Sequence, residues 1–190
     1  MIDSYDHSTA DHRKCFELVF DAIDNGEAEA CFGNHELSYL IDRHRCSGWD
    51  RDRAALMDDL AIDIHKRFKP AILLRKDFLV SHGGLTNQLW EKEGLTLETL
   101  PMWLGEAWID LNSSMHYIGK CRGGWHPFGG LFWATFREDF RPVSGLTQVF
   151  GHTRQRDGMQ VEYSQDVQPT GALTCWTFIE TNFLNWNLIS

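Results

Sequence analysis

The chain has 190 residues, and 43% of them are hydrophobic, which is enough to bury the core of one globular domain. The formal net charge of −9 at pH 7 argues against a broad surface for nucleic acid or for an anionic membrane. The five cysteines are odd in number and lack metal-finger spacing, so we expect reduced thiols and a cytoplasmic protein. No apolar stretch approaches the length that spans a membrane.

The first half of the chain predicts two helices and one strand. The spacing of Ser8 and Asp11 resembles a capping box, and apolar residues at helical spacing follow it until Asn25-Gly26 stops the helix. A short strand is expected over 29–32. The second helix is expected over 51–68, with its apolar residues on one stripe.

The second half predicts mostly strands. The runs 71–74 and 78–81 are typical of two paired strands around a turn, and 96–111 has helical periodicity. A long glycine-rich loop covers 119–130. Further strands are expected over 146–150, 159–163 and 172–179. The mixture predicts a single α/β domain over 1–190, without a dinucleotide fingerprint or a phosphate loop.

Three polar turns follow apolar runs where a strand would stop: Gly33-Asn34-His35-Glu36, Ser81-His82-Gly83-Gly84 and Gly151-His152-Thr153. One amide oxygen and two imidazoles from three strand ends form a metal-binding constellation, and His35 stands beside it as a proton donor. This donor set suits Mn, Fe, Zn or Co better than Ca or Mg. Taken singly, Asn34 is also typical of a turn, and either histidine of an ordinary hydrogen-bonded residue; together the three favour ligation.

These motifs, in this order, resemble those of the calcineurin-like metallophosphoesterases, in their serine/threonine phosphoprotein-phosphatase branch. The family pattern runs Asp-x-His, Gly-Asp-x-x-Asp, Gly-Asn-His-Glu, a histidine before glycines, and Gly-His. This chain matches the last three, and 80–86 is close to the protein-phosphatase form of the fourth. The resemblance extends to about Thr153. It implies a four-layer αββα sandwich, here truncated at its N-terminal strands and lacking the Asp-x-His and Gly-Asp motifs.

The resemblance also implies roles for individual residues. In the family, two divalent ions share a bridging aspartate and a water, and the hydroxide formed attacks phosphorus in line. Asn34, His82 and His152 would be ligands of one ion, and His35 the general acid, oriented by an aspartate. Asp3 fills that place if 1–4 is the tail of the second motif.

Two interpretations compete with this role of Asp3. In a rival register it is the first aspartate of the second motif and Asp6 is the second. It could also be a solvated acid near the N-terminus.

The phosphate group needs a cationic partner, for which the planar fork of arginine is suited. Arg137 lies roughly where relatives carry a phosphate-binding arginine, although a surface pairing with Glu138 or Asp139 is an equal alternative. Arg122 and Arg154 are weaker candidates. The loop 45–49 is distinctive, and a role in specificity is a hypothesis for it.

We therefore expect a metallophosphoesterase that hydrolyses phosphomonoesters, with phosphorylated proteins or small phosphomonoesters as partners. Two divalent metal ions are expected for the family, but this chain would retain only one partial site. Its cation would have neutral ligands alone, so weak metal binding and little turnover are expected. Self-association through exposed strand edges is also expected. The alternative is a catalytically inactive relative that works as a binding or inhibitory module.

Overall fold

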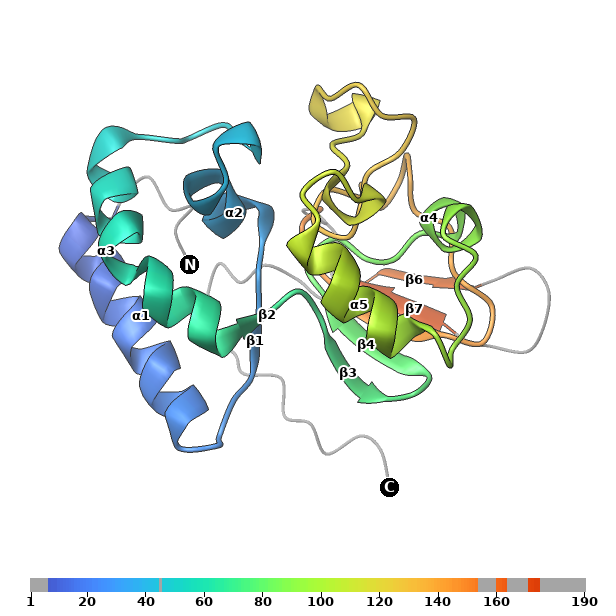
Figure 1. Cartoon of the computed structure of the whole chain (residues 1–190), viewed down its shortest axis with the longest axis horizontal. Coiled ribbons are helices and arrows are strands. Elements are labelled where there is room, and N and C mark those ends of the chain that lie inside the picture. Colours follow the sequence, from blue (N-terminus) through green and yellow to red (C-terminus); the bar gives the residue numbers. More distant parts are fainter. Residues whose placement is uncertain (1–6, 45, 154–159, 164–170, 175–190) are drawn as a thin grey trace.

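The computed structural model describes residues 7–44, 46–153, 160–163 and 171–174. Within these ranges the chain is a mixed α/β protein, as the sequence predicts. Figure 1 shows three helices, α1, α2 and α3, gathered on one side of a short strand pair, and a larger sheet with α4 and α5 on the other side.

The helical side is organised around α3 (Arg51–Arg67), which packs against both α1 (Thr9–Asp24) and α2 (Asn34–Leu40). The predicted capping box of α1 is present. The hydroxyl oxygen of Ser8 accepts from the Asp11 backbone N–H at 3.2 Å, and the Asp11 carboxylate accepts from the Ser8 N–H at 3.0 Å. A single 3₁₀ turn, η1 (Asp42–His44), follows α2.

A two-stranded parallel pair, β1 (Ala30–Cys31) and β2 (Phe68–Lys69), connects the two sides of the molecule. Phe32, directly after β1, is fully buried and stacks on Trp108 of α5 with 4.6 Å between ring centroids. The aromatic core is therefore continuous between the helical side and the sheet side.

Among the described residues, the larger sheet has five strands in the order β3-β4-β5-β7-β6. β3 (Ile72–Arg75) and β4 (Phe78–Ser81) form the predicted antiparallel hairpin. β5 (Thr147–Phe150) pairs in parallel with β4 and with β7 (Gly171–Thr174), and β6 (Gln160–Tyr163) pairs antiparallel with β7. The part of the expected strand beyond 174 lies outside the described residues.

The remaining helices are short. α5 (Leu100–Ile109) falls inside the predicted helix over 96–111, whereas α4 (Asn87–Lys92) and α2 are short helices that the sequence did not predict. Two 3₁₀ turns, η2 (Ser114–His116) and η3 (Lys120–Arg122), lead into and interrupt the predicted glycine-rich loop. In the described ranges, no helix combines the length and the apolar character needed to cross a membrane.

The parallel pairing of β4 and β5 positions the candidate site. Because neighbouring parallel strands end at the same edge of a sheet, the turns after β4 and after β5 lie side by side. The Gly151 N–H donates to the His82 carbonyl oxygen at 2.9 Å and joins these two turns. The four-layer sandwich stays a prediction.

Candidate functional site

The structure brings Asn34, His82 and His152 together at this sheet edge. The Nε2 atom of His82 lies 2.7 Å from the Asn34 side-chain oxygen and 3.0 Å from Nδ1 of His152. Atoms that share a cation through bonds of about 2.0–2.1 Å lie about 2.9–3.3 Å apart. An amide oxygen and two imidazole nitrogens are thus spaced close to what one divalent cation of the expected kind requires.

Gly33 allows this close approach. It is the N-cap of α2, so Asn34 is the first helical residue, and Glu36 in the first turn accepts the Gly33 N–H at 3.1 Å. A Cβ atom at position 33 would lie 2.8 Å from the Glu36 carboxylate and 3.0 Å from Nδ1 of His82. The other ring nitrogen of His82, Nδ1, therefore lies near the turn that carries the Glu36 carboxylate. A carboxylate or carbonyl near the second ring nitrogen is usual for a histidine that binds a metal.

His152 has an unusual backbone conformation, with φ at +63°. Such a conformation in a residue other than glycine costs about 1–3 kcal/mol and persists only where neighbours hold it. The hydroxyl of Thr153 holds this turn, because it accepts the Phe136 N–H at 3.0 Å and the Arg122 guanidinium at 3.3 Å. The strain thus lies at the residue that completes the constellation.

The electrostatics of His152 favour its neutral form. Burial, followed by the neighbouring charges of His82, Arg122 and His35, lowers the pKa of His152 to about 2. A neutral imidazole has the lone pair that a cation needs at pH 7. Its Nε2 atom is buried and has no hydrogen-bond partner among the described residues.

His35 lies next to Asn34 in α2, beside the constellation. Its Nδ1 atom is 3.5 Å from the sulfur of Cys46, and that thiol also lies 3.3 Å from the Ser38 hydroxyl. The sequence assigned the orienting role to Asp3, which lies outside the described residues. The structure therefore gives Cys46, the first described residue of the loop expected over 45–49, a contact with His35 that the sequence did not suggest.

The two described candidate arginines lie in different places. Arg137 is exposed on a turn and does not line the pocket described below. Arg122, the weaker candidate from sequence, comes from η3, donates to the Thr135 hydroxyl at 2.9 Å, and lines the pocket together with His152. Arg154 lies outside the described residues.

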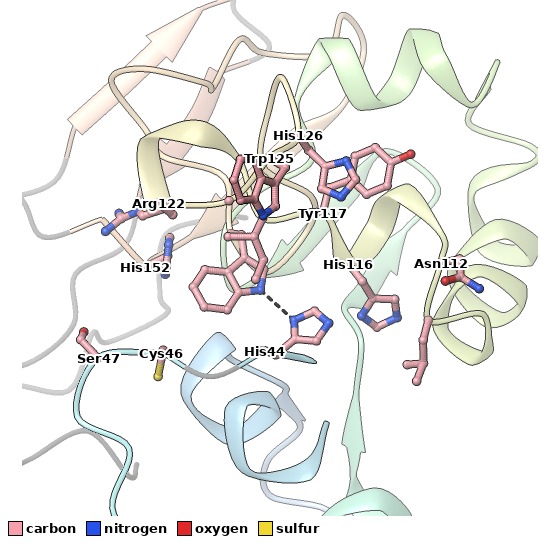
Figure 2. A pocket seen from close by; sticks show the side chains of 15 residues that line it. His44, Cys46, Ser47, Asn112, His116, Tyr117, Arg122, Trp125, His126 and His152 are labelled. Atoms are coloured by element: carbon pink, nitrogen blue, oxygen red, sulfur yellow. Dashed lines mark hydrogen bonds between the residues drawn. The ribbon is translucent and has the colours of Figure 1, made fainter. Parts of the chain in front are cut away.

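A pocket of about 730 Å³ opens beside the constellation (Figure 2). His152, Arg122 and Cys46 line it near the constellation, and none of its described lining residues carries a carboxylate. Most of the other large side chains that line it are aromatic or imidazole rings: His44, His116, Tyr117, Trp125, His126 and Trp133. None of these six residues belongs to the three motifs. In the sequence, His116 and His126 flank the glycine-rich loop, a position that favours a solvated loop over contact with a substrate.

In the described part of the chain, no three His, Cys, Asp or Glu side chains are grouped to hold a metal ion; the constellation has two imidazoles and an amide. No protein family, curated protein or solved structure matches the chain.

Proposed function

We propose that this protein is a metal-dependent phosphoesterase of the calcineurin-like type, with the four-layer αββα sandwich of that family, and that it hydrolyses phosphomonoesters. One observation supports this most: Nε2 of His82 lies within hydrogen-bond distance of both the Asn34 side-chain oxygen and Nδ1 of His152, although the three residues come from turns far apart in the sequence. The form of the motif at 80–86 makes serine- and threonine-phosphorylated proteins the first substrates to consider.

In this proposal the three donors hold one cation, and His35 gives a proton to the oxygen that leaves the phosphate. Two bound divalent ions (Mn, Fe, Zn or Co) would supply a water whose pKa is lowered towards neutral. Arg122, whose guanidinium is fixed by two threonine hydroxyls, is placed to bind phosphate oxygens, and Arg137 is the alternative.

The experiment measures Mn²⁺-dependent hydrolysis of 4-nitrophenyl phosphate together with direct Mn²⁺ binding. We expect His35→Ala to lower kcat by about a hundredfold or more, the usual scale for a lost general acid, and to leave Mn²⁺ binding unchanged. We expect His82→Ala to lose Mn²⁺ binding and hydrolysis together. His65→Ala is the matched control, because His65 is exposed on α3 and its Nδ1 bonds to Ala61 of the same helix.

The assay is run on this chain and on a longer chain that includes any residues encoded in frame before Met1. If neither form hydrolyses the ester with Mn, Fe, Zn or Co, the enzyme proposal is abandoned. Mn²⁺ binding that requires His82 but is accompanied by no hydrolysis in either form would favour the alternative, an inactive relative that works as a binding module.

A further inference from the structure

The pocket lies on the leaving-group side of the constellation, if the proposed function holds. His35 is the residue that protonates the leaving oxygen in that proposal, and it contacts Cys46, which lines the pocket. His152 belongs both to the constellation and to the pocket wall. A phosphate held at the constellation would therefore direct its leaving group into the pocket. Figure 2 shows His152 and Cys46 among the residues that line it.

The walls of the pocket are flat rings held by their neighbours. Tyr117 and His126 stack face to face, with 3.6 Å between ring centroids and 7° between ring planes. The indole N–H of Trp133 donates to Nδ1 of His44 at 3.1 Å, and this bond fixes both rings. Rings fixed in this way can stack on a flat ligand at little entropic cost.

Trp125 is the exception, because 93% of its surface is exposed to solvent. It follows Gly123 and Gly124 in the glycine-rich loop and lines the pocket from there. This indole is a flat apolar surface at the pocket, and aromatic side chains of this kind stack on flat ligands.

The pocket is also nearly uncharged. Among the described residues that line it, Arg122 is the one with a lysine or arginine side chain. His116 is 4% exposed, and burial lowers its pKa, so its ring is neutral at pH 7. The Trp108 carbonyl oxygen, 3.3 Å from Nε2 of His116, accepts the single ring proton, which leaves Nδ1 as a buried acceptor without a described partner.

We infer that this pocket binds a leaving group that carries a flat, uncharged aromatic ring. The preferred substrates would then be phosphomonoesters with such a ring, in place of the serine and threonine esters that the motif at 80–86 suggests. The volume of 730 Å³ lies within the roughly 300–1,000 Å³ of small-molecule sites and far exceeds the needs of a phosphoserine side chain. Hydrolysis breaks the bond between phosphorus and the leaving oxygen, water adds its oxygen to phosphorus, and His35 gives the leaving oxygen a proton. Phosphotyrosine carries its aromatic ring directly on the leaving oxygen, and a nucleoside monophosphate carries a flat base on its leaving group through the ribose.

The test compares phenylphosphonate with ethylphosphonate, whose carbon–phosphorus bonds are not hydrolysed, as ligands of the Mn²⁺-loaded chain. We expect calorimetry and competitive inhibition to show about tenfold tighter binding of the phenyl compound, the scale of one aromatic stacking contact. Trp125→Ala should abolish most of this difference without affecting folding, because the indole is exposed. Ile62→Ala, at a position 84% exposed on α3 and away from the pocket lining, is the control.

Equal affinity for the two phosphonates, or a preference that survives in Trp125→Ala, would overturn this inference and leave the phosphoesterase proposal standing. A Trp125-dependent aromatic preference in a chain that hydrolyses no ester would support the pocket and refute the proposed catalysis. Competition of O-phosphotyrosine and of adenosine 5′-monophosphate against phenylphosphonate shows which of the two kinds of aromatic ester the pocket prefers. Stronger competition by O-phosphoserine than by either would also overturn the inference.

Discussion

At the scale of single residues, the candidate site depends on Gly33, because this position has no room for a side chain. Gly33 has φ at −104°, a value that any residue adopts, so its backbone does not require glycine. What requires glycine is space, because the Glu36 carboxylate and the His82 ring both approach the position that a Cβ would occupy. The glycine of the Gly-Asn-His-Glu motif therefore has a packing reason that is independent of any family resemblance.

Gly33→Ala should consequently damage the site more than the fold. The added methyl group would push the His82 ring away from Asn34, and we expect Mn²⁺ affinity to fall about 10–100-fold, the usual effect of disturbing the surroundings of a ligand. The free energy of unfolding should change by about 1 kcal/mol or less, the scale of an N-cap substitution. Calorimetric titration with Mn²⁺ and urea denaturation measure the two quantities.

Gly105→Ala is the matched control. Gly105 lies in the middle of α5, and a Cβ there would meet no atom within 4 Å. The same substitution should raise stability by about 0.4–1 kcal/mol and leave Mn²⁺ affinity unchanged. If both variants lose Mn²⁺ affinity equally, the steric explanation for Gly33 is wrong.

Some site residues could be predicted from the sequence, and others could not. The motifs identified Asn34, His82 and His152 because each has glycine or a strand end beside it. Arg122 also has glycines beside it, but it belongs to none of the three motifs. Its position depends on hydroxyls of Thr135 and Thr153, which are 13 and 31 residues away, and only the fold reveals those contacts.

At the scale of elements, the turn that carries His82 is supported by the neighbouring strand. Gln148 of β5 is fully buried, and its side chain makes two hydrogen bonds to one residue of that turn. Its oxygen accepts the Leu85 N–H at 2.8 Å, and its amide donates to the Leu85 carbonyl oxygen at 2.9 Å. Two otherwise buried backbone groups are thus satisfied by one side chain.

We therefore expect Gln148→Leu to destabilise the protein by about 2–4 kcal/mol, because each buried backbone group left without a partner costs about 1–3 kcal/mol. Urea denaturation followed by circular dichroism measures this loss. Thr147→Val, on the same strand but half-buried, should change stability by less than about 0.5 kcal/mol. A Gln148→Leu variant as stable as the original chain would show that water replaces both bonds.

The elements that could be predicted are those with local signals. α1 has a capping box and apolar periodicity, and the hairpin of β3 and β4 has a short turn, so neighbouring residues determine both. α2 was missed because it has only seven residues and starts inside a motif that was interpreted as a turn. The parallel pairing of β1 with β2 was missed because it joins segments 38 residues apart, as in the pair Ala30 and Phe68.

At the scale of the whole molecule, buried imidazoles couple the stability of the fold to pH. His12 lies in α1 on the helical side, and burial, followed by the charge of Arg53, lowers its pKa. His116 lies on the sheet side beside the pocket, and burial lowers its pKa as well. Both side chains are almost completely buried, so neither accepts a proton readily in the folded state.

The direction of the pH dependence follows from these shifts. In the unfolded chain both histidines titrate near a pKa of about 6.5, whereas in the folded chain they titrate at lower pH. The unfolded state therefore binds more protons below about pH 6.5, and the free energy of unfolding should fall as the pH drops from 7 to 5. Above pH 7 these two residues should contribute no further change.

Urea denaturation midpoints measured at intervals from pH 5 to 8, with a chelator present so that metal binding does not contribute, test this prediction. His116→Gln removes one of these titrating groups from a buried position, so the decline below pH 6.5 should become shallower in that variant. His65→Ala, which removes an exposed histidine, should keep the original slope. A midpoint that rises as the pH falls from 7 to 5 would mean that the buried imidazoles gain protons on folding, contrary to their surroundings in the structure.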